Sequence, residues 1–66
     1  MYNTDMLEVG KIYQWRSDPL FIKVLTEPSL ELDPESKFYR EYTFSGQNIY
    51  TKIVDTYVCC SGWGEV

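Results

Sequence analysis

Phe38-Tyr-Arg-Glu-Tyr-Thr-Phe44 begins the stretch that decides the fold class; it is followed by Ser45-Gly46-Gln47-Asn48 and then by Ile49-Tyr-Thr-Lys-Ile-Val-Asp-Thr-Tyr-Val-Cys-Cys60. Two runs rich in aromatic and β-branched residues on either side of a short glycine-containing segment are typical of a β-hairpin. We predict strands over residues 38–44 and 49–60, joined by a four-residue loop at 45–48. The stretch predicts a fold class but contains no motif that predicts a chemical function.

The four-residue loop determines which residues face each other across this hairpin. It places Phe44 opposite Ile49 and collects apolar side chains on one face, namely Phe38, Tyr42, Phe44, Ile49 and Ile53. On the other face Glu41 lies across from Lys52, and opposite charges in that position stabilise a strand pair. A two-residue loop at 45–46 loses this charge pairing, so the longer loop is preferred.

Two shorter strands are predicted before the hairpin. Gly10 predicts a bend, and residues 11–16 predict a strand in which Ile12 and Tyr13 compete for the core. Ser17-Asp18-Pro19 is a turn signal. It joins this strand to residues 20–25, whose expected core face is Leu20, Ile22 and Val24. Phe21 and Leu25 lie on the opposite face and need a second buried surface or a partner.

Residues 26–37 predict a long loop, because Pro28 and Pro34 prevent a central strand. The loop carries the acidic residues Glu27, Glu31, Asp33 and Glu35. We expect Leu30 and Leu32 to pack back onto the domain. Connections of this length in a small domain are often functional, so the loop is the first candidate for a partner-specific element.

The C-terminal segment contains two adjacent cysteines and a tryptophan between glycines. Cys59 and Cys60 point to opposite faces of a strand, which predicts one small buried residue and one at an edge. Gly62 and Gly64 allow a sharp turn and a final short strand around Trp63. Two interpretations of Trp63 stay open: it fills the core, or it is exposed and anchors a partner.

Residues 1–66 therefore predict one all-β domain of four to five antiparallel strands, with residues 1–5 as a loose N-terminal arm. The succession of Val9-Gly10-Lys11-Ile12-Tyr13, Phe21-Ile-Lys-Val-Leu25 and Tyr57-Val58 resembles small SH3-like barrel proteins of bacteria and bacteriophages. That resemblance implies a small, partly open SH3-like barrel. The chain lacks the acidic run and Trp-Trp pair of the peptide-binding SH3 domains, so no proline-rich ligand site is carried over.

Charge and composition argue against several classes of protein. The net charge is −4, the chain has no His, and its six Lys and Arg are scattered, which disfavours direct nucleic-acid binding. No apolar run approaches the ~20 residues that span a bilayer, and the N-terminus lacks signal-peptide features, so a cytoplasmic location is expected. We expect no enzymatic activity, no cofactor and no metal site, since no nucleophile, base or ligand cluster is recognisable.

Two functional hypotheses follow from these observations. The first is a protein-interaction module, a small phage-type inhibitor that docks on and blocks a larger bacterial protein with a basic surface, such as a nucleic-acid-handling or defence enzyme. Its predicted partner-binding residues are Phe21, Leu25, Glu27, Glu31, Asp33, Glu35, Tyr39 and Trp63. The alternative is an oligomeric barrel that sequesters a small molecule or nucleotide, with Arg16, Lys37, Arg40 or Lys52 on its phosphates. Homo-oligomerisation is expected in either case, and whether the acidic loop mimics nucleic acid stays open.

Overall fold

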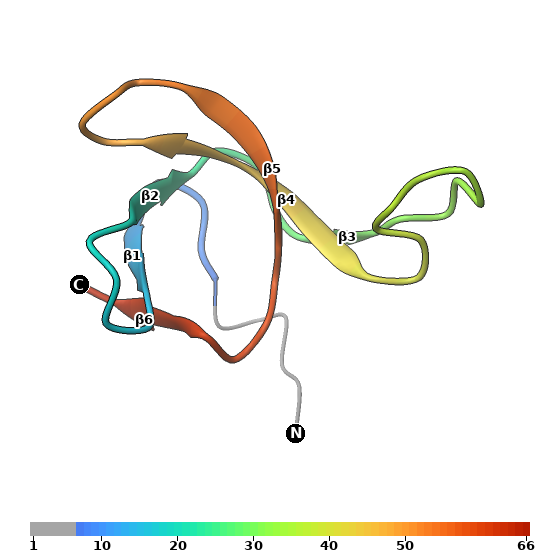
Figure 1. Ribbon diagram of the computed structural model, residues 1–66, viewed down its shortest axis with the longest axis horizontal. Coiled ribbons are helices and arrows are strands. Elements are labelled where there is room, and N and C mark those ends of the chain that lie inside the picture. The colour runs from blue at the N-terminus through green and yellow to red at the C-terminus, as the bar shows by residue number, and fades with distance from the viewer. Residues whose placement is uncertain (1–6) are drawn as a thin grey trace.

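The computed structural model describes residues 7–66, so the predicted arm at 1–5 lies outside the described residues. Six strands form one antiparallel sheet (Figure 1). They are β1 Ile12–Trp15, β2 Phe21–Val24, β3 Ser29–Leu30, β4 Tyr42–Asn48, β5 Val54–Val58 and β6 Trp63–Glu65. The all-β class is confirmed. Within residues 7–66 no helix is long and apolar enough to cross a membrane.

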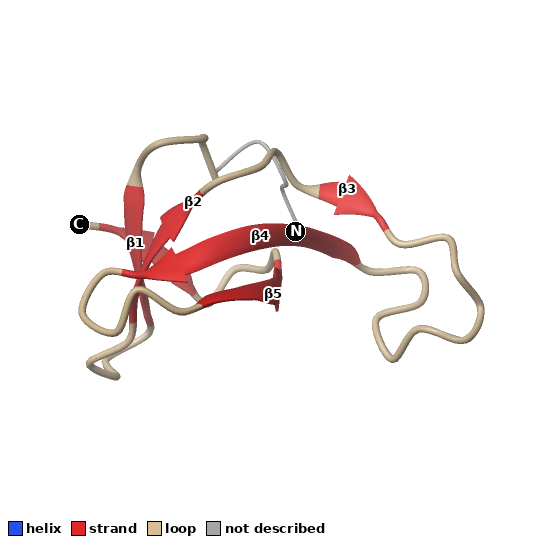
Figure 2. Cartoon of the chain, turned by 90° about the horizontal axis from the view of Figure 1, so that it is seen from above, coloured by secondary structure: helices blue, strands red, loops and turns tan. Residues whose placement is uncertain are grey.

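Strand β4 is the centre of the sheet. One of its edges pairs with β3 near Tyr42 and with β2 near Asn48, while the other edge pairs with β5. The sheet continues from β2 through β1 to β6. Figure 2 shows β4 as a long curved strand that spans most of the molecule. Among residues 7–66 the sheet wraps around the core but does not close, because there β5 pairs only with β4 and β6 only with β1. A sixth strand, β3, exceeds the predicted four to five.

The predicted register of the central hairpin is wrong. Phe44 lies opposite Tyr57 rather than Ile49, and the turn follows Asn48 instead of beginning at Ser45. The first strand starts at Tyr42, so Phe38 and Glu41 belong to a loop and the Glu41–Lys52 pairing does not occur. The predicted apolar face is only partly correct. Phe44 is buried, Phe38 and Ile49 are half-buried, Tyr42 is 37% exposed and Ile53 is 63% exposed.

Turn chemistry and packing explain this register. The Asn48 side chain accepts hydrogen bonds from the backbone N–H groups of Tyr50 and Thr51, at 2.8 and 3.0 Å. Lys52 adopts the left-handed conformation with φ 66° and completes the turn. Gly46 is buried inside β4, where a Cβ would overlap with Ile22 Cγ2. The glycine that predicted a turn is therefore a packing position of the strand.

The core lies between the two ends of the curved sheet. Its buried apolar residues are Leu7, Tyr13, Ile22, Val24, Phe44, Cys59 and Trp63. The predicted core face of β2 is confirmed, since Ile22 and Val24 are fully buried and Leu20 packs against the core cluster. Of the two candidates in β1, Tyr13 is the buried one. The hairpin of β1 and β2, the bend at Gly10 with φ 90° and the burial of Cys59 also agree with the prediction.

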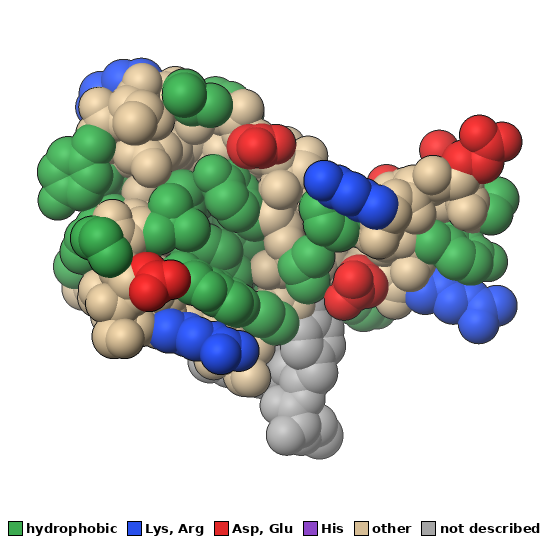
Figure 3. All heavy atoms as spheres, viewed as in Figure 1, with side chains coloured by type: hydrophobic (Ala, Val, Ile, Leu, Met, Phe, Trp, Pro, Cys, Tyr) green, Lys and Arg blue, Asp and Glu red, His purple; other side chains and the backbone are tan. Residues whose placement is uncertain are grey.

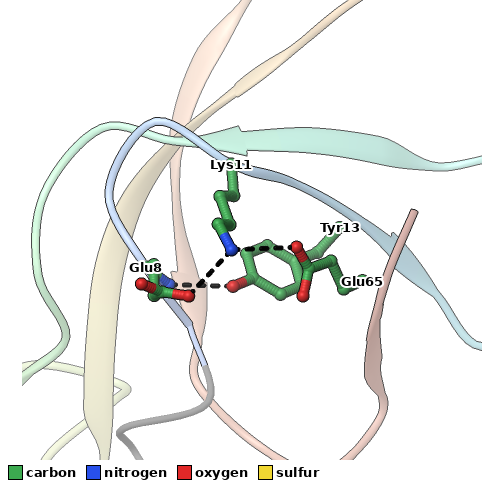
Figure 4. A network of polar contacts seen from close by, with 4 residues as sticks. All are labelled: Glu8, Lys11, Tyr13 and Glu65. Atoms are coloured by element: carbon green, nitrogen blue, oxygen red, sulfur yellow. Dashed lines mark hydrogen bonds and ion pairs between the residues drawn. The ribbon is translucent and has the colours of Figure 1, made fainter.

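Polar contacts tie the segment before β1 to β6 (Figure 4). Lys11 forms ion pairs with Glu8 and Glu65 at 3.0 and 3.1 Å, and the Glu8 N–H donates to the hydroxyl oxygen of Tyr13 at 2.9 Å. The hydrogen bonds and charges of Glu8 and Glu65 raise the pKa of Lys11. Because Lys11, Glu8 and Glu65 are all solvent-exposed, these ion pairs contribute little to stability.

Candidate functional site

A loop between β3 and β4 stands away from the rest of the molecule. We call residues 31–41 the finger (Figure 1). Its base is closed by two backbone hydrogen bonds between Glu31 and its neighbours across the loop, Arg40 and Glu41, each 2.9 Å long. Inside the finger the Glu31 and Asp33 carboxylates accept backbone N–H groups two residues ahead. The finger thus has regular internal hydrogen bonding.

The predicted loop at 26–37 and the observed finger differ in their bounds. Residues 29–30 form β3 at the edge of the sheet, and the loop extends to residue 41. The expectation that Leu30 and Leu32 pack back onto the domain is wrong, since they are 42% and 72% exposed. β3 pairs with only the first residues of β4, so nothing in the sheet lies over these side chains.

The finger brings apolar and acidic side chains together. Leu32 and Tyr39 are exposed, and Asp33 and Glu35 are exposed beside them in sequence. The Arg40 guanidinium lies 5.2 Å from the ring centroid of Tyr39. Figure 3 shows acidic, basic and hydrophobic side chains intermixed on this projection. Such a mixture of exposed apolar groups and charges is typical of a protein-binding surface.

The other predicted partner-binding residues lie elsewhere. Glu27 is exposed between β2 and β3. Leu25 follows β2 and is 37% exposed, while Phe21 packs edge-on against Tyr50 with ring centroids 5.9 Å apart. The structure therefore gathers Glu31, Asp33, Glu35 and Tyr39 on the finger, and it leaves Phe21, Leu25, Glu27 and Trp63 outside it.

Trp63 is a core residue, so of its two interpretations the buried one is correct. Its indole is 5% exposed and its ring contacts the rings of Trp15, Phe44 and Tyr57, with centroids 5.0 to 5.8 Å apart. The indole N–H donates to the backbone oxygen of Val58 at 2.9 Å. This hydrogen bond ties β6 to the edge of β5 that no strand covers, and Trp63 is not available as an exposed anchor.

An apolar groove adjoins this ring cluster, and it was not predicted from the sequence. Its volume is about 280 Å³, and it is lined by Trp15, Leu20, Phe38, Thr56, Tyr57, Val58 and Trp63. These residues come from the β1–β2 hairpin, the finger, β5 and β6. The groove lies beside β5, which pairs with β4 alone in the part of the chain that the structure describes. Figure 3 shows hydrophobic side chains exposed inside the ring of strands.

Two cations lie over aromatic rings of the groove wall. The Arg16 guanidinium lies 5.0 Å from the ring centroid of Trp15, and the Lys37 ammonium lies 5.1 Å from that of Phe38. Both rings line the groove. In each case the cation and the ring are neighbours in the sequence. The adjacent pairs Trp15-Arg16 and Lys37-Phe38 are therefore the sequence signal from which these cation–ring contacts can be predicted.

Tyr57 is the titratable group in the groove wall. Partial burial, and secondarily the negative charge of Asp55, raise the pKa of the Tyr57 hydroxyl. The fold thus favours the neutral phenol. Its contribution to the free energy of unfolding is fully present below the unfolded pKa of about 10. It is lost as the pH rises through the higher folded value.

We therefore expect the denaturant midpoint to fall above about pH 10, where unfolded Tyr57 ionises first. Tyr57→Phe removes this group, so its midpoint should fall less between pH 8 and pH 11 than that of the unmodified chain. Urea unfolding followed by Trp fluorescence measures both midpoints. Equal pH dependence of the two proteins would contradict the assignment.

Comparisons of the chain with protein-family models, with curated proteins and with solved structures give no match. Among residues 7–66 no group of three or more His, Cys, Asp or Glu side chains is placed to hold a metal ion. The finger and the groove are therefore the candidate functional surfaces of the described chain.

Proposed function

We propose that the protein is a non-enzymatic binding module that docks on a larger protein through its finger. The observation that carries this proposal is that the finger projects from the sheet with its own hydrogen bonds and exposes Leu32 at 72% and Tyr39 at 41%. An apolar side chain as exposed as Leu32 gains free energy when a partner covers it. The SH3-like resemblance stays a prediction, supported by the short antiparallel strands that curve around one core.

Charge supports a basic surface on that partner. Residues 27–41 contain Glu27, Glu31, Asp33, Glu35 and Glu41 against Lys37 and Arg40. An acidic projection is attracted to a basic surface, and this attraction raises the association rate more than it raises the affinity. Blocking of a basic bacterial enzyme, as a phage inhibitor does, is one consequence of such docking.

Finger variants test this proposal. We expect Leu32→Ser and Glu35→Gln each to reduce partner binding, by about tenfold for Leu32 because burial of its side chain is worth about 1.5 kcal/mol or more. Neither side chain is buried, so both variants should keep the fold. The measurement is quantitative affinity capture from bacterial lysate with the tagged chain, followed by mass spectrometry.

The matched controls lie at the opposite end of the molecule. Val66→Ser removes an equally exposed apolar side chain at the C-terminus, and Asp18→Asn removes a carboxylate in the β1–β2 turn (Figure 1). Support requires a protein that both controls retain and both finger variants lose. If every captured protein binds all four variants alike, the finger is not the docking surface. Light scattering of the same samples measures the mass and so tests homo-oligomerisation.

A further inference from the structure

The groove beside β5 has the composition of a ligand site, and it is distinct from the exposed tip of the finger. Of the side chains that line it, four are aromatic rings, namely Trp15, Phe38, Tyr57 and Trp63. Leu20 and Val58 add aliphatic walls and Thr56 adds a hydroxyl. Ligand pockets in proteins are largely apolar and have few polar groups, which orient the ligand.

The size of the groove selects the size of the ligand. A closed apolar cavity of roughly 150 Å³ accommodates one benzene ring. The groove measures about 280 Å³ on the same basis, so it has room for two fused rings. The aromatic walls favour a planar ligand, since offset stacking and edge-to-face contacts each add to the free energy of burial.

The two cations over the groove rings select the charge of the ligand. Arg16 and Lys37 stand over two of the groove rings in a chain with ten acidic and six basic residues. Asp55 is a carboxylate next to the β5 wall of the groove: it accepts the backbone N–H of Thr56 at 2.8 Å and its charge acts on Tyr57. An anionic group on the ligand is therefore attracted toward Arg16 and Lys37 and repelled by Asp55.

A second strand added to the edge of β5 fits the same observations less well. The register directs the backbone groups of Val54, Thr56 and Val58 away from β4. However, the Val58 oxygen already accepts the Trp63 indole N–H, and the Thr56 N–H donates to the Asp55 carboxylate. Two of the outward groups are thus occupied within the chain, which protects this edge from strand pairing.

We propose that the groove binds a fused two-ring aromatic anion, whose rings lie among Trp15, Phe38, Tyr57 and Trp63 and whose anionic group meets Arg16 and Lys37. Purine nucleotides and indole carboxylates share this chemistry. Phe38 and Lys37 belong to the finger, so the ligand also contacts the base of the finger.

The test uses two matched pairs of probes on the full chain: AMP with adenosine, and indole-3-acetate with indole-3-acetamide. Both tryptophans of the chain line the groove, so their two indole N–H signals in a ¹⁵N–¹H NMR spectrum report directly on binding. We expect an anion to shift both signals and its neutral partner to bind at least about tenfold more weakly. Binding of AMP or of indole-3-acetate alone identifies phosphate or carboxylate as the preferred anion.

Substitutions of the cations test where the anionic group of the ligand binds. Arg16→Gln with Lys37→Gln should weaken binding of the anion at least about tenfold, whereas Lys23→Gln, which removes an exposed cation of β2 that lies over neither of the rings beside Arg16 and Lys37, should change it less than about twofold. Added NaCl should weaken binding of the anion by the unmodified chain and leave the neutral partner unaffected. The proposal is overturned by equal binding of anion and neutral partner, by equal loss in Lys23→Gln, or by unchanged indole signals with every probe. If one of these results is found while capture of a partner protein still depends on the finger, the groove proposal is refuted and the finger proposal stands.

Discussion

Trp63→Ala is expected to unfold most of the protein at 25 °C. Truncation of a buried Trp costs about 3–5 kcal/mol, and a core in a domain this small rarely supplies more than about 3–5 kcal/mol in total. The loss is concentrated at one side chain because Trp63 contacts three other rings and donates to the Val58 oxygen. Far-UV circular dichroism and the urea midpoint measure the result.

Trp63→Phe separates the hydrogen bond from the packing. It keeps an aromatic ring but leaves the Val58 oxygen without the indole donor, which costs about 1–3 kcal/mol. We expect a folded protein with a lower midpoint. Tyr50→Ala is the matched control, since it truncates a ring that is 70% exposed. A Trp63→Ala protein no less stable than Tyr50→Ala would show that Trp63 is not the centre of the core.

Gly46→Ala is expected to destabilise the protein by about 3 kcal/mol, at the upper end of the usual cost of overpacking. A methyl group at this position would overlap with Ile22 Cγ2 and lie 3.1 Å from Tyr57 and 3.2 Å from Phe44. Ile22 is fully buried in β2 and cannot move aside without displacing the core. At about 4–8 °C for each kcal/mol, the melting temperature should fall by more than about 10 °C.

Gly64→Ala is the control for this substitution. Gly64 also lies in a strand, β6, and nothing lies within 4 Å of the position that its Cβ would occupy. Substitution there should be neutral or stabilise the fold by up to about 1 kcal/mol, because alanine restricts the unfolded chain. Similar melting temperatures for the two variants would contradict the observed packing of Gly46 against Ile22.

Local patterns predicted the first hairpin and its core face. Alternation in residues 20–25 identified Ile22 and Val24 as buried, and the Asp-Pro turn joined the correct strands. Gly10 marked a true bend because its φ of 90° strongly favours glycine. These features depend on residues within a few positions of one another, so they can be predicted from the sequence.

The central hairpin shows why local patterns are insufficient. Residues 49–52, Ile-Tyr-Thr-Lys, have the aromatic and β-branched character of a strand, yet they form the turn. Phe44 therefore pairs with Tyr57 instead of Ile49. The contact of Gly46 with Ile22 requires β2 to lie beside β4, and that pairing joins segments more than 20 residues apart. The error for residues 38–41 has the same cause. Their aromatic residues are typical of a strand, although they form the C-terminal part of the finger.

The two functional surfaces also differ in how far the sequence predicts them. The acidic loop and Tyr39 were recognisable from composition, because a proline-containing acidic segment cannot supply a central strand. The groove was not recognisable, because its walls come from residues 15, 20, 38, 56–58 and 63. These residues meet only when the sheet curves and brings distant strands together. The sequence by itself determined an all-β domain with a core built from rings and β-branched residues. Only the tertiary structure decided that Trp63 is buried and that Arg16 and Lys37 lie over rings of one groove, because these depend on contacts between distant strands.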